Sequence, residues 1–164
     1  MSEFSILQVE DEAKEVSFQQ EAFRRTGICN PVQVVTDGQQ AIDYLAGREP
    51  FQNRRRYPLP GLVLLKLRLP RQPGLEVLQW IRAQPSLRAL VVIVLSPARP
   101  ESDLARAYEL GANSCVLQPA TWDEWVELAR GLKAWWLYHN LLAPTFRQEW
   151  RRAGVDIRAS RPAA

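Results

Sequence analysis

The sequence places a lysine near the end of its most apolar run. The run is Gly61-Leu-Val-Leu-Leu-Lys-Leu-Arg-Leu-Pro70, and its length and composition predict a strand buried on both faces of a parallel sheet. Lys66 lies toward the carboxyl end of that strand, which is the edge where open parallel sheets bind ligands. Because an isolated ammonium is costly to bury, we expect Lys66 to be paired with acidic groups, to be neutral or to reach a cleft.

Other polar residues follow three further apolar runs. They are Glu10, Asp11, Ser96 and Gln118. Carboxylates are the ligands that hard divalent cations prefer, and a lysine beside carboxylates can also form a Schiff base with a carbonyl substrate. The sequence supplies no substrate pocket for such an enzyme, so we favour Lys66 as the partner of the acidic residues. The plainer alternative is that Lys66 reaches solvent and pairs with nothing.

The elements that must position these residues alternate along the chain. In order, the predicted strands and helices are Phe4–Val9, Ala13–Arg25, Val32–Val35, Gln39–Leu45, Gly61–Pro70, Leu75–Ala83, Leu90–Leu95, Ser102–Leu110, Ser114–Leu117 and a last helix from Thr121 to about Leu142. This alternation predicts right-handed βαβ units, and hence an α/β fold with a doubly wound five-stranded parallel sheet. Thr121 and Glu124 form a capping-box pattern at the start of the last helix.

Length and composition limit the possible classes of protein. The chain has 164 residues, 46% apolar and 24% charged, so we predict one domain over residues 1–142 and an extension over 143–164 that is partly helical or disordered. The net charge of +3 and the pI near 9.1 argue neither for nor against an anionic partner. Cys29 and Cys115 have no metal-ligand spacing, and the sequence has no signal-peptide or membrane-span pattern. We therefore expect a cytoplasmic protein without a membrane partner.

Four runs of the sequence resemble one known family. They are Leu7-Gln-Val-Glu-Asp-Glu12, Thr36-Asp-Gly-Gln-Gln-Ala-Ile-Asp-Tyr-Leu45, the run Gly61–Pro70 with Pro73-Gly74 behind it, and Ala107-Tyr-Glu-Leu-Gly-Ala-Asn113. Together they make residues 4–142 similar to a response-regulator receiver domain, and closest to the single-domain receivers that partner phytochrome-type histidine kinases. The resemblance implies a flavodoxin-like sheet with strand order 2-1-3-4-5.

The resemblance also implies a chemistry, which is phosphoryl transfer from a kinase histidine to an aspartate with the help of a magnesium ion. The family's functional positions correspond here to the acid pair Glu10 and Asp11, the hydroxyl Ser96, Lys66 at the acceptor aspartate, Gln118 at the phosphoryl-binding lysine and Cys115 at the reporter aromatic. Gln118 is followed by Pro119, and the resemblance implies a cis bond between them.

The replacement of the acceptor decides the function that we expect. Aspartyl phosphorylation needs a carboxylate nucleophile, which Lys66 lacks. An ammonium about 4 Å from a magnesium ion would repel it by several kcal/mol at an effective dielectric of about 20. We therefore expect no metal and no cofactor, with the Lys66 ammonium bridging Glu10 and Asp11. The interpretation is a degenerate pseudo-receiver, not an enzyme, that signals by contact with a histidine kinase or another receiver.

The last predicted helix and the segment after it are rich in aromatic residues. At their spacing these side chains cannot all pack on the sheet, so some aromatic area should stay exposed and form an interface. The interface candidates are Trp122, Trp125, Trp135, Trp136, Tyr138 and Trp150. We expect a homodimer, and the alternative is that the tail merely covers the domain's own helices.

A polar loop supplies the runner-up function. Arg54, Arg55 and Arg56, with the arginine-rich tail, could bind nucleic acid through its phosphate groups. A solvated loop tip is the more common origin of such a run. We favour the solvated loop and do not expect a nucleic-acid partner.

Overall fold

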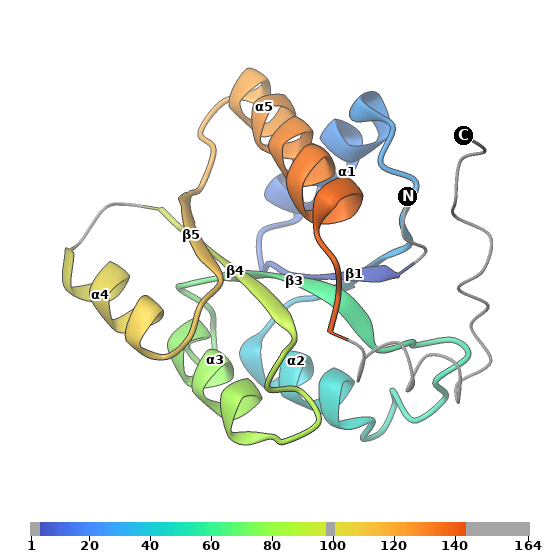
Figure 1. Ribbon diagram of the computed structural model, residues 1–164, viewed down its shortest axis with the longest axis vertical. Coiled ribbons are helices and arrows are strands. Elements are labelled where there is room, and N and C mark those ends of the chain that lie inside the picture. Colours follow the sequence, from blue (N-terminus) through green and yellow to red (C-terminus); the bar gives the residue numbers. More distant parts are fainter. Residues whose placement is uncertain (1–3, 98–100, 144–164) are drawn as a thin grey trace.

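Five parallel strands form the centre of the computed structural model, which describes residues 4–97 and 101–143 (Figure 1). The strands are β1 (Ser5–Val9), β2 (Val32–Val35), β3 (Pro60–Lys66), β4 (Val91–Ser96) and β5 (Ser114–Leu117). They pair in the order β2-β1-β3-β4-β5, and every pair is parallel. The predicted doubly wound sheet with strand order 2-1-3-4-5 is therefore confirmed.

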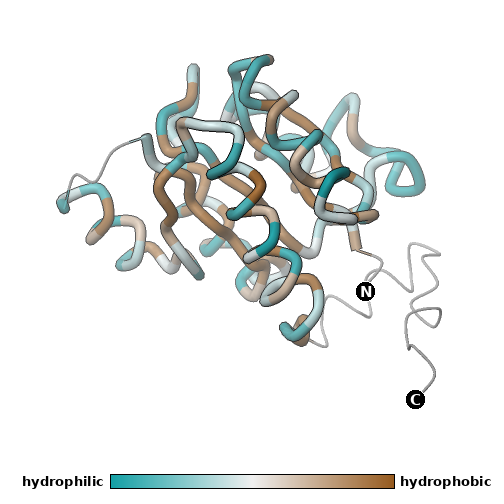
Figure 2. Tube along the Cα trace, turned by 90° about the horizontal axis from the view of Figure 1, so that it is seen from above, coloured by the Kyte–Doolittle hydropathy of each residue, from teal (hydrophilic) through white to brown (hydrophobic). Residues whose placement is uncertain are grey.

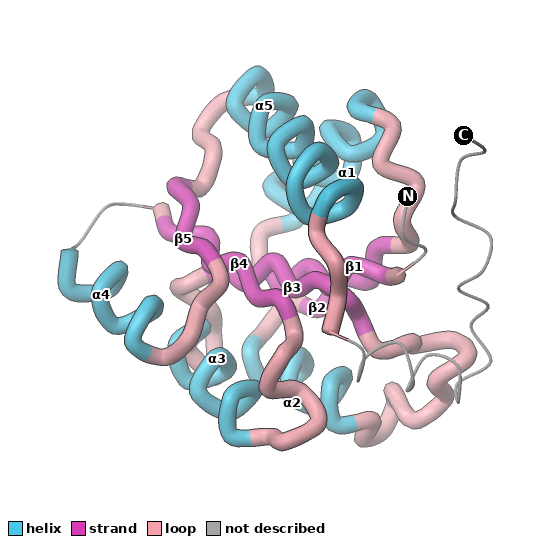
Figure 3. Tube along the Cα trace, in the orientation of Figure 1, coloured by secondary structure: helices cyan, strands magenta, loops and turns pink. Residues whose placement is uncertain are grey.

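Helices cover both faces of this sheet. They are α1 (Ala13–Thr26), α2 (Gly38–Ala46), α3 (Gly74–Ala83), α4 (Glu101–Glu109) and α5 (Trp122–Leu132), followed by the π-helical segment η1 (Lys133–His139). Helices α1 and α5 lie on one face, and α2 and α3 lie on the other (Figures 1 and 3). Each face has its own apolar core, one beneath α1 and α5 and one beneath α2 and α3.

The apolar residues are concentrated along the middle of the sheet (Figure 2). Every residue of β3 and of β4 is buried, as expected for strands that helices cover on both faces. Since Lys66 ends β3, it leaves this apolar environment only at the carboxyl edge of the sheet. The apolar core therefore determines that the Lys66 side chain reaches polar surroundings at the carboxyl edge of the sheet.

Local sequence signals set the ends of the helices. Helix α1 stops at Gly27, whose left-handed backbone (φ 70°) a glycine adopts without strain. Helix α5 begins with the predicted capping box, in which Thr121 and Glu124 bond each other's backbone N–H groups. The prediction of one helix reaching about Leu142 is wrong, because α5 passes into η1 at Lys133 and the chain becomes extended at Asn140.

Two further expectations can be compared with the described residues. The Gln118–Pro119 peptide bond is not cis, so the cis bond that the family resemblance implies is wrong. Among the described residues, the cis peptide bond is Glu49–Pro50. No helix of residues 4–97 and 101–143 has the length and apolarity needed to cross a membrane. Nearly all of the predicted extension, residues 144–164, lies outside the described residues.

Candidate functional site

The carboxyl ends of β1 and β3 bring two charged residues side by side. The strands are neighbours, and Val9 lies opposite Leu65, so the residues that follow them, Glu10 and Lys66, emerge next to each other. Both side chains are almost completely buried, with exposed fractions of 2% for Glu10 and 6% for Lys66. The register of the sheet therefore puts an acid and a base in contact at the edge where the sequence predicts a site.

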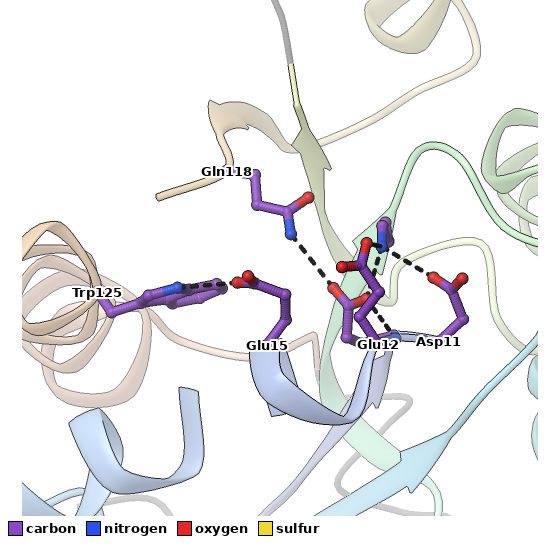
Figure 4. Close-up of polar contacts among 7 residues, drawn as sticks. Asp11, Glu12, Glu15, Gln118 and Trp125 are labelled. Atoms are coloured by element: carbon purple, nitrogen blue, oxygen red, sulfur yellow. Dashed lines mark hydrogen bonds and ion pairs between the residues drawn. The ribbon is translucent and has the colours of Figure 1, made fainter. Parts of the chain in front are cut away.

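The Lys66 ammonium donates hydrogen bonds to three carboxylates, of which Asp11 and Glu12 are labelled in Figure 4. Its Nζ lies 2.7 Å from Glu10 Oε1, 2.9 Å from Asp11 Oδ1 and 2.6 Å from Glu12 Oε1. An ammonium has three N–H donors, so all the donors of Lys66 are used. One positive charge meets three negative charges, which leaves the cluster of these four residues with a formal charge of −2.

Glu12 is the member of this cluster that the sequence reasoning missed. Its side chain is 61% exposed, and the residue is the N-cap of α1. The run of three successive carboxylates was the available signal. It did not identify Glu12, because the directions of successive side chains depend on where the strand ends and the helix begins.

Gln118 reaches the same cluster from the loop after β5. Its Nε2 donates a long hydrogen bond of 3.5 Å to Glu10 Oε2 (Figure 4). In the described part of the chain, its buried Oε1 has no hydrogen-bond partner. The Glu10 carboxylate therefore accepts one strong bond from Lys66, one backbone bond from Glu12 N and one weak bond from Gln118.

Burial and charge pairing act in opposite directions on the pKa values. Burial is the largest effect on Glu10 and raises its pKa, against the bonds from Lys66 and from the Glu12 N–H. Burial also acts upward on Asp11, but the Lys66 hydrogen bond and charge together lower its pKa. Burial alone would lower the pKa of Lys66, yet the three carboxylates raise it above its ordinary 10.5. Lys66 is therefore protonated, and Asp11 ionised, at neutral pH.

The model of one protein family matches residues 6–130 of this chain, and its description is the response regulator receiver domain. The chain belongs to this family. Its sheet order and the position of its acidic residues agree with that membership.

Individual proteins are similar to this chain over most of its length. The probable methanogenesis regulatory protein FilR2 of Methanothrix harundinacea is 36% identical over 137 residues, covering 84% of this chain and 86% of FilR2. The Mn²⁺-bound response regulator Rcp1 has a TM-score of 0.78 at 29% identity, covering 85% of this chain and 99% of the other. The phosphorylated cyanobacterial phytochrome response regulator RcpA has a TM-score of 0.79 at 30% identity, covering 86% and 99%.

The acidic residues of this receiver do not fit a divalent ion while Lys66 is in place. Carboxylate oxygens of Glu10, Asp11 and Glu12 lie within 4.8 Å of one another, which is close enough for a shared ion. Each of these three carboxylates already holds the Lys66 ammonium at 2.6–2.9 Å. Magnesium needs its oxygen ligands at about 2.0–2.1 Å, so it would have to displace the ammonium or lie against it.

The two remaining family positions are Ser96 and Cys115. A pocket of about 370 Å³ lies over the cluster, and Lys66 and Gln118 line it, whereas Ser96 and Cys115 do not. Ser96 is buried at the end of β4. Cys115 is half-buried on the edge strand β5, where burial raises the pKa of its thiol.

The aromatic candidates divide into buried and exposed side chains. The proposal that Trp125 belongs to an interface is wrong, because this residue is 1% exposed and its indole N–H donates to Glu15 Oε2 at 3.1 Å (Figure 4). Trp122 and Trp136 are half-buried against the core beneath α1 and α5. The exposed candidates are Trp135 at 63% and Tyr138 at 59%, both in η1. Trp150 lies outside the described residues.

The arginine run is divided between a structural and an exposed part. Arg54 donates to the carbonyl oxygens of Tyr44 at 2.7 Å and Leu45 at 2.8 Å, which satisfies backbone acceptors at the end of α2. Arg55 and Arg56 are exposed. Because its guanidinium serves α2, Arg54 is not part of a free basic patch, and this weakens the nucleic-acid interpretation.

Proposed function

We propose that this chain is a pseudo-receiver, which works in two-component-type signalling by protein contact and does not accept a phosphoryl group at position 66. The observation that carries the proposal is the Lys66 ammonium, bound by three carboxylates at the strand end where the family resemblance puts the acceptor aspartate. A residue with no carboxylate oxygen cannot form the acyl phosphate.

The electrostatics of the cluster support the same proposal. Lys66 stays protonated because the carboxylates raise its pKa, so its nitrogen has no lone pair for attack on phosphorus. The formal charge of −2 on the cluster repels an incoming phosphoryl anion. The family's phosphoryl-binding lysine is replaced by Gln118, which is uncharged.

The proposed partner is a histidine kinase, of the phytochrome type, or another receiver. The similarity to RcpA, described as a phytochrome response regulator, favours that type of kinase. The exposed side chains of Trp135 and Tyr138 favour a homodimer that buries them. We infer a cytoplasmic signalling protein without enzymatic turnover.

Incubation with acetyl phosphate and magnesium, read by intact mass, tests the main proposal. The expected result is an unchanged mass under conditions that phosphorylate a receiver with the acceptor aspartate, used as the positive control. A gain of one phosphoryl group that is lost in Asp11→Asn would mean that another carboxylate is the acceptor, and the proposal would be wrong.

A further inference from the structure

The geometry points to a built-in cation at the strand ends. We propose that the Lys66 ammonium permanently replaces the divalent ion of related receivers, and that Glu12 is recruited as its third carboxylate ligand. The inference deepens the proposed function and rests on it in one respect, namely that Lys66 occupies the acceptor position. It concerns how the site is held together, and not which partner the protein contacts.

The first argument is that the ammonium is saturated. Its three donors meet three acceptors at 2.6–2.9 Å, and its side chain is 6% exposed. Charge-assisted hydrogen bonds of this length are the strong ones. A divalent ion would have to break all three bonds and leave a buried, unpaired ammonium beside it, which is costly.

The second argument comes from the start of α1. The N-cap side chains of α2 and α5, Asp37 and Thr121, each accept a hydrogen bond from the backbone of the first helical turn. The N-cap side chain of α1, Glu12, makes no such bond. Its carboxylate is directed to Lys66 instead. The Glu12 carboxylate therefore bonds Lys66 and not the backbone of α1, and this bond connects the end of β3 to the start of α1.

Both arguments lead to the same physical consequence. Lys66 joins the end of β1 through Glu10, the following turn through Asp11 and the start of α1 through Glu12. The position of α1 relative to the sheet is then set by a covalently attached charge. A charge that cannot dissociate makes this arrangement independent of the concentration of divalent ions.

Thermal unfolding with magnesium or manganese chloride, or with EDTA, tests the replacement. In the wild-type protein the melting temperature should change by less than about 1 °C between the ion and the chelator. In Lys66→Met, which keeps most of the side-chain volume and frees the carboxylates, a saturating ion should raise it by about 3 °C or more. Lys66→Arg keeps the positive charge and should respond as weakly as the wild type.

Each outcome either supports or overturns the proposal that Lys66 replaces the divalent ion. An ion-dependent rise in the wild-type melting temperature, or no rise in Lys66→Met, would overturn it. If Lys66→Met does not fold in EDTA, recovery of the folded protein on adding manganese would support the replacement, and failure to recover, with Lys66→Arg folded, would overturn it. These readouts do not involve phosphoryl donors, so the proposed function could fail in the acetyl phosphate experiment while the built-in cation stands.

Amide hydrogen exchange at the first hydrogen-bonded amides of α1, beginning with the Val16 N–H that donates to the Glu12 carbonyl, tests the role of Glu12. Glu12→Ala removes the third ligand and should increase exchange there by about tenfold or more, since the start of the helix loses its attachment. Glu21→Ala is the matched control, because it removes an α1 carboxylate that pairs with Arg24 on the helix surface. Equal exchange in the two variants would overturn the assignment of Glu12.

Discussion

The charge cluster around Lys66 buries side chains that are usually exposed, whereas the aromatic segment η1 exposes side chains that are usually buried. Lys66 and Glu10 are charged side chains with exposed fractions of 6% and 2%. Trp135 and Tyr138 are large aromatic side chains with exposed fractions of 63% and 59%. Charged residues are rarely buried unless paired, and extended aromatic exposure marks an interaction surface.

The difference teaches where each region finds its partners. The buried Lys66 ammonium uses all three of its own N–H donors within the chain, at distances of 2.6–2.9 Å, so the lysine needs no further partner. Within the described residues, the exposed rings of η1 are not covered by another element. We infer that the strand ends serve stability here, while the aromatic segment is the better candidate for contact with another protein.

Removing the lysine should produce the largest effect. Lys66→Ala leaves three adjacent carboxylates without a cation, and we expect a loss of about 3 kcal/mol in the free energy of unfolding, the lower end of the range for breaking a buried pair, because Glu12 is solvent-accessible. Urea denaturation at neutral pH measures this loss. Lys14→Ala, at an exposed site, is the control and should change the free energy of unfolding little. A similarly small loss in both variants would contradict the role of Lys66 as the cation that stabilises the three carboxylates.

Raising the pH should remove part of the same stabilisation. The folded pKa of Lys66 is raised above 10.5, so its contribution is fully present below about pH 10.5 and is lost as the pH rises through the folded value. The stability of the wild type should therefore fall more steeply on the alkaline side than that of Lys66→Met. Parallel pH profiles of the two proteins in denaturant titrations would contradict the pairing.

Changing the aromatic segment should affect association and not folding. Trp135→Ser removes an exposed ring, so we expect the unfolding free energy to stay within about 0.5 kcal/mol and the dimer dissociation constant to rise about tenfold or more. Sedimentation velocity over a concentration series measures the second quantity. Arg55→Ser changes another exposed residue as the control. A monomeric wild type, or unchanged association in Trp135→Ser, would remove η1 from the proposed interface.

Trp125 is a buried residue of α5 and should show a purely structural effect. Trp125→Phe keeps an aromatic ring in the core but loses the N–H that bonds Glu15, so the unfolding free energy should fall by about 1 kcal/mol beyond any loss from the smaller ring. Comparison with Glu15→Gln, which retains an acceptor, isolates the bond. A change of dimerisation in Trp125→Phe, with folding unaffected, would restore this residue to the interface.

The smallest effect is expected from an ion pair at the rim of the pocket. Arg68 and Asp103 are 3.7 Å apart, and the arginine side chain is 70% exposed. Surface pairs of this kind contribute about 0.2–1 kcal/mol, so Arg68→Ala should cost no more than about 0.5 kcal/mol. A double-mutant cycle with Asp103→Ala measures the coupling, and a value above about 1 kcal/mol would extend the charge cluster to this pair.

The sequence pattern by itself determined the doubly wound parallel sheet and the edge at which Lys66 and the acid pair meet, whereas the strand order was what the family resemblance implied. Apolar runs of strand length and helical periods alternate clearly enough to predict a doubly wound sheet, and residues just after parallel strands converge for geometric reasons. The same reasoning could not place the Glu12 side chain. Its direction depends on where the strand ends and the helix begins, and a shift of that boundary by one residue would point the carboxylate away from Lys66.

Tertiary structure decided which aromatic side chains are buried and what the arginine run does. Trp125 and Trp135 are the same residue type in consecutive helical elements, yet Trp125 is 1% exposed in α5 and Trp135 is 63% exposed in η1. Arg54 serves the end of α2 because a loop folds back on that helix. Such assignments depend on contacts between distant segments, which local composition does not encode.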